Sequence, residues 1–448
     1  MKRKGLVFKT IFILILCTLE VFSNNPVLKA GISKVDMTPT ASVFMGGYDE
    51  TCRTGPSDGV YGKIYIRSLV FDDGIRRLAI IVADIVDIPG ERNQAIRDLI
   101  AAETDIPVQH ILLGSAHNHA APSLDSRNSE SDWYQSFDNN VVKAVKAAIA
   151  DLEPVKTGGG TGISHIGMNR RKRMEETVSY LTFDENNSSQ SYGKYNTNTP
   201  VKIREMDGVY RLGANPEGSI DEEVGIMRID KLSGEPKAVL VNYACHGTSL
   251  GGRNNTISPE WHGHMLEHIE KTMPGITGIF LPGAGGDINP RFVGGLDGYE
   301  DNLENTANLG YEIGKEVIRV LSGIHTTLPV NPAIKIVHED ITCPLKYDRV
   351  IRDFRTTTND VPVTAVRIDD FVWVTFPGEL FHEIGKKVKS ATHARYPFLA
   401  GYCNGAMGYL PTQQAYSEGG YEPWTSRFAP VTEKIFLKET EKMLLKLY

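Results

Sequence analysis

The stretch "RLAIIVAD" (77–84) is an apolar run rich in β-branched residues, and it is followed by "ERNQAIRDLIAAET" (91–104) and by "HILLG" (110–114). The middle segment carries apolar side chains on one helical face, at Ala95, Ile96, Leu99 and Ile100. Pro89-Gly90 marks the turn that precedes this helix. A strand, a helix and a second strand in this order predict a βαβ unit.

The same order of segments occurs twice more along the chain. "KAVLVNYAC" (237–245) is followed by a helical segment over 260–273 and by "TGIFL" (277–281), and "DDFVWVTF" (369–376) is followed by "ELFHEIGKKVKSA" (379–391). These units predict an α/β fold with a mixed, largely parallel β-sheet core and flanking helices. Ligands of such sheets bind outside the carboxyl ends of the strands, and we therefore expect a metal site at those ends.

Polar groups suited to catalysis follow several of the predicted strands. They are His117 and His119 in "SAHNHAAPS", His246 in "YACHGTS", the glycine-rich "PGAGGDINP" (282–290) and Glu379 in "PGEL". Imidazoles and a carboxylate are the ligands of hydrolytic zinc sites, which leave one position for water. Their wide separation in the sequence does not fix the ligand set. His117 and His119 admit three interpretations: both bind a metal, one binds it while the other serves the substrate, or they form a hydrogen-bonded loop pair.

Other polar segments favour a structural interpretation. His262, His264 and His268 lie on one predicted helix and are expected on a packed or solvated face. "GMNRRKR" (167–173) has the composition of a solvated basic loop, and Cys245 is expected to be buried. The glycine-rich segment lacks the Lys and Ser/Thr of a P-loop, so it is either an oxyanion-binding turn or a tight connection. "LGSAH" is not the GxSxG motif of a serine nucleophile.

The composition and the first residues indicate an exported globular protein. The chain has 448 residues, is 41% hydrophobic and carries a net charge of −7, which argues against binding of nucleic acids. A basic start, an apolar run and Val21-Phe22-Ser23 predict a signal peptide over residues 1–23. A signal peptide implies secretion or a periplasmic location. The remaining residues, 24–448, are expected to form one catalytic domain. The apolar run is short for a membrane span, and Leu16 does not favour lipoprotein anchoring through Cys17. "DENNSSQSYGKYNTNTP" (184–200) is expected to be a surface loop, and the remaining cysteines contain no CxxC pair.

A series of motifs carries a resemblance to a known family. In chain order these motifs are "AGISKVDMTPT", "FMGGY", "SAHNHAAPS", "MNR", "NYACHGTSL", "GGDINP", "FPGEL" and "GYLPTQQAYSEGGYE". The sequence resembles the neutral/alkaline non-lysosomal ceramidases over their N-terminal catalytic domain, which are zinc amidases that cleave the N-acyl bond of ceramide. The resemblance implies one Zn²⁺ per chain, bound by His117, His246, Glu379 and Tyr416, with Tyr409 and Tyr421 nearby. It implies substrate-side roles for His119 and Arg170.

The sequence departs from the family pattern at two places. Asn289 stands where the family's "GDxSP" stretch has a serine, and no immunoglobulin-like domain of the kind found in the family is expected before Tyr448. Asn289 is no nucleophile but donates hydrogen bonds, so we expect attack by metal-activated water, with Asn289 as a donor to the oxyanion and His119 as the proton carrier.

The expected function is therefore that of an exported zinc-dependent hydrolase of amide bonds. The expected substrate is an N-acyl lipid, which is compatible with peripheral membrane contact. One alternative is a deacylase or esterase that acts on acylated sugars, and another is a non-catalytic binding protein on the same fold. The sequence leaves the oligomeric state open.

Overall fold

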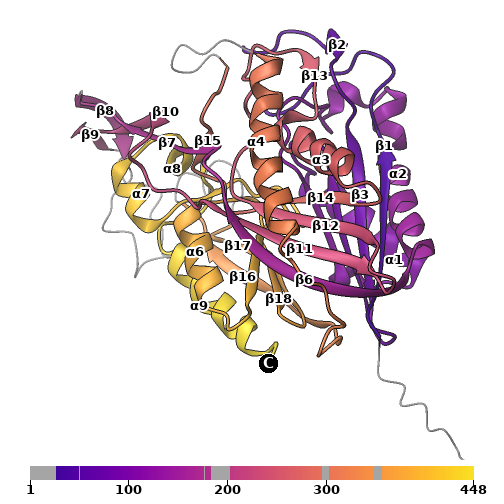
Figure 1. The fold of residues 1–448 in the computed structure, drawn as a ribbon. Helices are drawn as coiled ribbons and strands as arrows, with labels where there is room; N and C mark the ends of the chain where they lie inside the picture. Colours follow the sequence, from indigo (N-terminus) through magenta and orange to yellow (C-terminus); the bar gives the residue numbers. More distant parts are fainter. Residues whose placement is uncertain (1–26, 50, 176, 183–201, 295–301, 347–355) are drawn as a thin grey trace, which may run out of the picture.

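The computed structural model describes residues 27–49, 51–175, 177–182, 202–294, 302–346 and 356–448 (Figure 1). The predicted signal peptide and the polar segment 184–200 lie outside these ranges. In the described residues, helices cover the two halves of a large mixed sheet, and a smaller sheet packs beside it (Figure 1).

The large sheet has eight strands in the order β14-β12-β11-β6-β1-β3-β4-β5. Its strands are β1 (Lys29–Asp36), β3 (Tyr65–Asp72), β4 (Arg77–Ala83), β5 (Ile111–Ser115), β6 (Glu153–Ile163), β11 (Glu223–Lys231), β12 (Pro236–Tyr243) and β14 (Thr277–Pro282). The two pairs predicted from βαβ patterns, β4–β5 and β12–β14, are parallel. The other pairs in this sheet are antiparallel. The prediction of a largely parallel sheet was therefore wrong, because the strands between the two βαβ units pair in antiparallel order.

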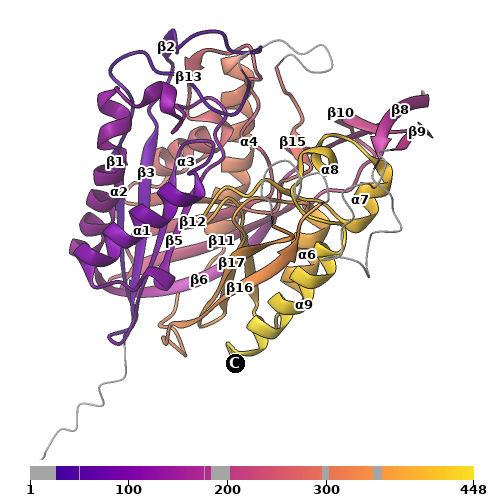
Figure 2. The same ribbon diagram turned by 180° about the vertical axis from the view of Figure 1, so that it is seen from behind.

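Two pairs of helices cover different halves of this sheet. Helices α1 (Gly90–Thr104) and α2 (Asp132–Ala150) pack on the half formed by β1, β3, β4 and β5, and α3 (Glu260–Thr272) and α4 (Leu303–Leu321) pack on the half formed by β6, β11, β12 and β14 (Figures 1 and 2). The alternation of side chains along a strand places them in two apolar clusters. In β4, Leu78, Ile80 and Val82 enter one apolar cluster, whereas Ala79, Ile81 and Ala83 enter the cluster under α1 and α2.

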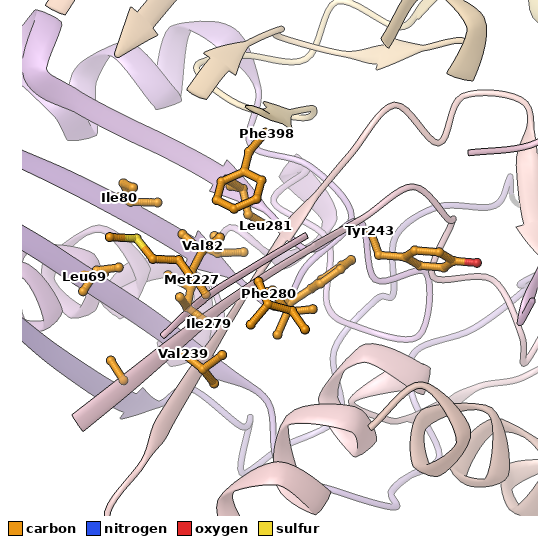
Figure 3. Packing of buried hydrophobic residues seen from close by; sticks show 14 of the residues in the cluster. Leu69, Ile80, Val82, Met227, Val239, Tyr243, Ile279, Phe280, Leu281 and Phe398 are labelled. Atoms are coloured by element: carbon orange, nitrogen blue, oxygen red, sulfur yellow. The ribbon is translucent and has the colours of Figure 1, made fainter. Parts of the chain in front are cut away.

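The smaller sheet has the order β16-β17-β18-β20. Its strands are β16 (Lys335–Pro344), β17 (Thr358–Ile368), β18 (Phe371–Thr375) and β20 (Tyr396–Ala400), and it packs against α6 (His382–Ser390) and α9 (Thr432–Leu445). The pair β18–β20 is parallel, and β20 is the strand that completes the third unit, for which the sequence predicted only the first strand and the helix. Figure 3 shows Phe398 of β20 among large-sheet residues such as Leu281 and Met227, so one core joins the two sheets.

Short elements complete the described structure. They are β2 (Gly59–Val60), β7 (Gly167–Arg173), β8 (Thr177–Thr182), β9 (Lys202–Asp207), β10 (Tyr210–Asn215), β13 (Thr256–Ile257), β15 (Ile288–Pro290), β19 (Glu379–Leu380), β21 (Tyr409–Leu410), α7 (Gln413–Glu418) and α8 (Tyr421–Thr425). The predicted helix over 379–391 begins only at His382, because Glu379 and Leu380 form β19 and pair with β21. Among the described helices, none is both long and apolar enough to cross a lipid bilayer.

Candidate active site

Three polar side chains from distant parts of the sequence meet beyond the ends of the strands. His117 follows β5, His246 follows β12, and Glu379 follows β18. The Nε2 atom of His246 lies 2.9 Å from Oε2 of Glu379, and Nε2 of His117 lies 3.5 Å from the same oxygen. The structure thus brings together three of the four residues predicted as metal ligands.

His119 belongs to the same group. Its Nε2 atom lies 3.1 Å from Nε2 of His117, and His117, His119 and His246 each present a ring nitrogen within 4.8 Å of the others. Four tetrahedral zinc ligands at about 2.0–2.1 Å from the metal are themselves about 3.3 Å apart. The distances of 2.9, 3.1 and 3.5 Å are close to this spacing. The cluster therefore has the size of a zinc site.

The tautomers of two histidines also fit a bound cation. His117 Nδ1 lies 2.8 Å from the carbonyl oxygen of Val86, and His246 Nδ1 lies 2.7 Å from that of Gly285. A carbonyl only accepts hydrogen bonds, so Nδ1 carries the proton in both rings and Nε2 presents a lone pair. Both Nε2 atoms lie near the carboxylate of Glu379, and Nε2 of His246 also accepts from Nη1 of Arg170 at 3.0 Å. Metal-binding histidines are oriented by bonds of this kind through their other ring nitrogen.

Burial and neighbouring charges set the protonation of the group. Burial lowers the pKa of His246 to about 4, and the charge of Arg170 acts in the same direction. Burial and the neighbouring histidines lower the pKa of His119 well below its usual value. Burial alone would raise the pKa of Glu379, but interactions with His117 and His246 outweigh it and hold that pKa well below its usual value. At neutral pH the group therefore presents neutral His119 and His246 imidazoles and an ionised carboxylate, as a divalent cation requires.

The backbone is strained at His117, and the surroundings of His119 are crowded. His117 has φ of +56°, a left-handed conformation that is unusual for a residue other than glycine and is concentrated at functional sites. His119 packs under Gly47, whose φ is +89° and at which a Cβ atom would lie 2.3 Å from Nδ1 of His119. The ring of Tyr48 contacts the edge of His119 at 5.1 Å. The "FMGGY" segment therefore covers the second histidine closely.

Arg170 lies beside this group on strand β7. Its Nη1 atom lies 3.0 Å from His246 Nε2 and 3.2 Å from Asn289 Oδ1, and its Nε donates to Glu422 at 2.8 Å. The carboxylate of Glu422 also accepts from Arg171. The expectation of a solvated loop for "GMNRRKR" was wrong, because these two arginines are buried against a glutamate 251 or more residues away.

Asn289 lies at the predicted place in the glycine-rich turn. Its Oδ1 atom accepts from Arg170 and from the Thr248 hydroxyl, at 3.2 and 3.4 Å, which turns the NH₂ group away from these donors. The turn itself is fastened by Asp287, whose carboxylate accepts from the backbone N–H and from Nδ1 of His382. This geometry makes the NH₂ of Asn289 a donor available to a ligand in the site.

The structure places the predicted tyrosine ligand elsewhere. The hydroxyl of Tyr416 donates to the carbonyl oxygen of Phe428 at 2.7 Å and lies 3.0 Å from the Ser426 hydroxyl. Tyr409 instead pairs directly with Glu379 across the parallel strands β19 and β21, so the two side chains leave the same face. The guanidinium of Arg170 lies 5.4 Å from the ring centre of Tyr409. Tyr409 is therefore the phenol beside the group, although Tyr416 was the residue predicted from the motif.

Two further residues of the site were missed by sequence reasoning. Glu422 neutralises Arg170, and Tyr402 stacks on His117. The pair Tyr421-Glu422 in "GGYE" gives no local signal for a buried ion pair, because its partner is distant in the sequence.

The histidines of α3 behave as expected for a packed face: His262 is fully buried and stacks on Phe280 at 5.3 Å. The described cysteines, Cys52, Cys245, Cys343 and Cys403, are all free thiols.

Comparisons with known proteins identify the family and the fold. The family model of neutral/alkaline non-lysosomal ceramidase, N-terminal, matches residues 28–300. A solved structure described as "Ceramidase complexed with C2" superposes with a TM-score of 0.73 at 16% identity, over 94% of this chain and 75% of that one. The crystal structure of neutral ceramidase from Pseudomonas aeruginosa gives a TM-score of 0.72 at 16% identity, over 95% of this chain and 75% of that one. The comparison with curated protein sequences gives no match. On the extent of the family match, this chain belongs to the neutral/alkaline non-lysosomal ceramidase family.

Proposed function

We propose that the protein is an exported zinc-dependent hydrolase that cleaves the amide bond of an N-acyl lipid. Membership of the ceramidase family supports a hydrolase of amide bonds. The observation that carries the metal dependence is the convergence of His117 Nε2 and His246 Nε2 on one oxygen of Glu379. The Nε2 atom of neutral His246 and Oε2 of Glu379 are both acceptors, and zinc would join the Arg170 guanidinium, 3.0 Å from His246 Nε2, in offsetting their repulsion.

His117, His246 and Glu379 would hold the zinc, with Tyr409 as the phenol closest to a fourth position. Zinc, when bound, lowers the pKa of water and polarises a carbonyl group. The geometry around Tyr416 supports replacing it with Tyr409 in this set, since the Tyr416 hydroxyl is bound to Phe428 and Ser426.

The residues around the metal position would bind the substrate carbonyl and transfer a proton. Arg170 is held by Glu422 with its charge toward His246, and its Nη2 atom is buried without a hydrogen-bond partner in the described residues. It would orient the substrate carbonyl together with the NH₂ group of Asn289, and both donors stabilise a developing oxyanion. His119 is a neutral imidazole beside His117, and it would carry the proton to the leaving amine.

Export is proposed from the N-terminal sequence. The basic residues Lys2 to Lys4 and the apolar run that follows them support a signal peptide. N-terminal sequencing of protein secreted from an expression host tests this point, and an intact Met1 on exported protein would contradict cleavage near Ser23.

Metal analysis of the purified full chain tests the main proposal. We expect about one zinc per chain in the wild type, loss of zinc in His117→Ala and in His246→Ala, and zinc-dependent hydrolysis of a short-chain N-acyl sphingoid base. His268→Ala is the matched control, because His268 lies on α3 outside the cluster. A folded wild-type chain that binds no zinc in zinc-replete buffer would overturn the metal site. Zinc binding with hydrolysis of acylated sugars but not of N-acyl lipids would overturn the substrate class.

A further inference from the structure

Tyr402 lies outside the motifs that resemble the ceramidase family, and its ring packs flat on His117, a proposed metal ligand. The ring of Tyr402 stacks on His117 with a centroid distance of 4.0 Å and an interplanar angle of 19°. The side chain is 4% exposed. His119 and His246 meet the same imidazole at steep angles, 86° and 72°. Tyr402 is therefore the stacked neighbour of His117, whereas the two histidines approach its edge.

The backbone holds Tyr402 firmly in this place. Tyr402 has φ of +54°, its N–H donates to the carbonyl oxygen of Gly378 at 3.0 Å, and its own carbonyl accepts from the N–H of Ser115 at 3.2 Å. On either side, Gly401 donates to Pro282 at 2.9 Å and Cys403 donates to Phe376 at 3.1 Å. The segment 401–403 thus connects the regions around the ends of β5, β14 and β18, from which His117 and Glu379 also emerge.

The imidazole of His117 needs a support of this kind. Its left-handed backbone persists only where the surroundings determine it. The bond from Nδ1 to Val86 fixes one ring atom but leaves the ring free to swing about that bond. A flat ring at 4.0 Å blocks this swing and keeps Nε2 directed at Glu379.

We propose that Tyr402 is a positioning residue of the metal centre, and that it acts through its ring by holding the imidazole of His117 toward the metal. The proposal rests on the metal site of the proposed function. The Tyr402 hydroxyl is buried without a hydrogen-bond partner in the described part of the chain. Residues that orient metal ligands typically change metal affinity by about 10–100-fold when they are replaced.

The test compares two substitutions that separate the ring from the hydroxyl. In Tyr402→Phe the stacked ring remains, and we expect zinc affinity, measured by competition with a chromophoric chelator, close to that of the wild type. In Tyr402→Leu the flat ring is lost, and we expect zinc affinity to fall by about 10–100-fold. The visible spectrum of the Co²⁺-substituted protein should change in the Leu variant and be retained in the Phe variant.

A matched control separates this effect from general destabilisation. Tyr396→Leu removes another stacked ring, which lies 5.1 Å from Phe371 in the smaller sheet, and it should leave the zinc affinity unchanged. Should Tyr402→Leu fail to fold, Tyr402→Met fills a similar volume without a planar ring and takes its place. Thermal unfolding of each variant monitors the fold separately from metal binding.

Two outcomes would overturn the proposal while the metal site stands. Wild-type affinity and an unchanged Co²⁺ spectrum in a folded Leu or Met variant would show that the stack does not position His117. Equal losses in the Phe and Leu variants would show that the hydroxyl, and not the ring, is responsible. Failure of the proposed function gives a different result, since zinc then binds neither to the wild type nor to any variant.

Discussion

The Nε2 atom of His246 and the Oε2 atom of Glu379 lie 2.9 Å apart across 133 residues of sequence. Nδ1 of His246 is hydrogen-bonded to carbonyl oxygens, so the two facing atoms are both acceptors. So close an approach is favourable only with positive charge nearby, and Nη1 of Arg170 lies 3.0 Å from the same Nε2 atom. Burial and the charge of Arg170 lower the pKa of His246 to about 4, so the ring is neutral at neutral pH. The fold thus brings a neutral imidazole and a carboxylate together, and both are groups that could hold a metal.

Replacing Glu379 with glutamine should separate metal binding from stability. The amide loses the negative charge, and we expect zinc affinity to fall by roughly 100-fold or more, since even residues that only orient ligands cost 10–100-fold. In metal-free protein the amide N–H₂ can donate to His246, so the melting temperature of Glu379→Gln should exceed that of the metal-free wild type. Calorimetry with and without zinc measures both effects. A variant that is less stable than the wild type without metal would contradict the repulsion between the two acceptors.

The two tyrosines near the end of the chain should respond differently to loss of their hydroxyl groups. Tyr409 pairs with Glu379, and Tyr409→Phe should weaken zinc binding. Tyr416→Phe removes the bonds to Phe428 and Ser426, and it should lower stability by about 0.5–1.5 kcal/mol while zinc affinity stays unchanged. Chelator competition and urea unfolding of both variants distinguish the roles. The reverse pattern would restore Tyr416 as the ligand.

The sequence predicted two parallel pairs of the fold but not the way in which they are joined. Strand–helix–strand patterns identified β4–β5 and β12–β14, because each pattern is local, whereas β20, the parallel partner of β18, was not predicted. The antiparallel pairing of β1, β3, β6 and β11 depends on partners that no local periodicity specifies. The prediction of a largely parallel sheet failed for this reason.

Local sequence patterns also identified some residues of the candidate site and missed those whose partners are distant in the sequence. His117, His246 and Glu379 were found because they follow apolar strands, and the carboxyl ends of strands gather ligands. Arg170 looked like part of a solvated basic loop, because the carboxylate that neutralises it, Glu422, is 252 residues away. Tyr409 and Tyr416 are equally good candidates within "GYLPTQQAY". Only the pairing of β19 with β21 sets Tyr409 against Glu379.

Asn289 should be needed for turnover and not for metal binding. Its oxygen is occupied by Arg170 and Thr248, and its NH₂ group is free to donate to the oxyanion. Asn289→Ala should lower kcat by roughly 10²–10³, the usual loss for one oxyanion donor, with the zinc content unchanged. Steady-state kinetics beside metal analysis check this expectation. Wild-type turnover in a zinc-loaded Asn289→Ala protein would remove the residue from the mechanism.

His382 should make the stability of the protein depend on pH through its contact with Asp287. The two side chains are buried, with Nδ1 of His382 2.7 Å from Oδ2 of Asp287, and the Nε2 atom lies 2.9 Å from the Ser219 hydroxyl. Burial lowers the pKa of His382, but the charge of Asp287 and its hydrogen bond outweigh burial, so the pKa is raised above 6.5. The folded state thus binds this proton more tightly than the unfolded state does. The stabilisation is fully present below about pH 6.5 and is lost as the pH rises through the folded pKa.

His382→Gln keeps neutral hydrogen-bonding capacity and removes the titration. We expect the variant to melt well below the wild type at pH 6, and we expect this difference in melting temperature to shrink toward pH 9. Because His393 lies at the surface beyond α6, where its ring packs on Tyr448, His393→Gln is a suitable control and should show no such convergence. A difference between wild type and His382→Gln that stays constant from pH 6 to pH 9 would mean that the contact with Asp287 does not depend on the charge of His382. The hydrogen bond alone would then fasten α6 to the turn that carries Asn289.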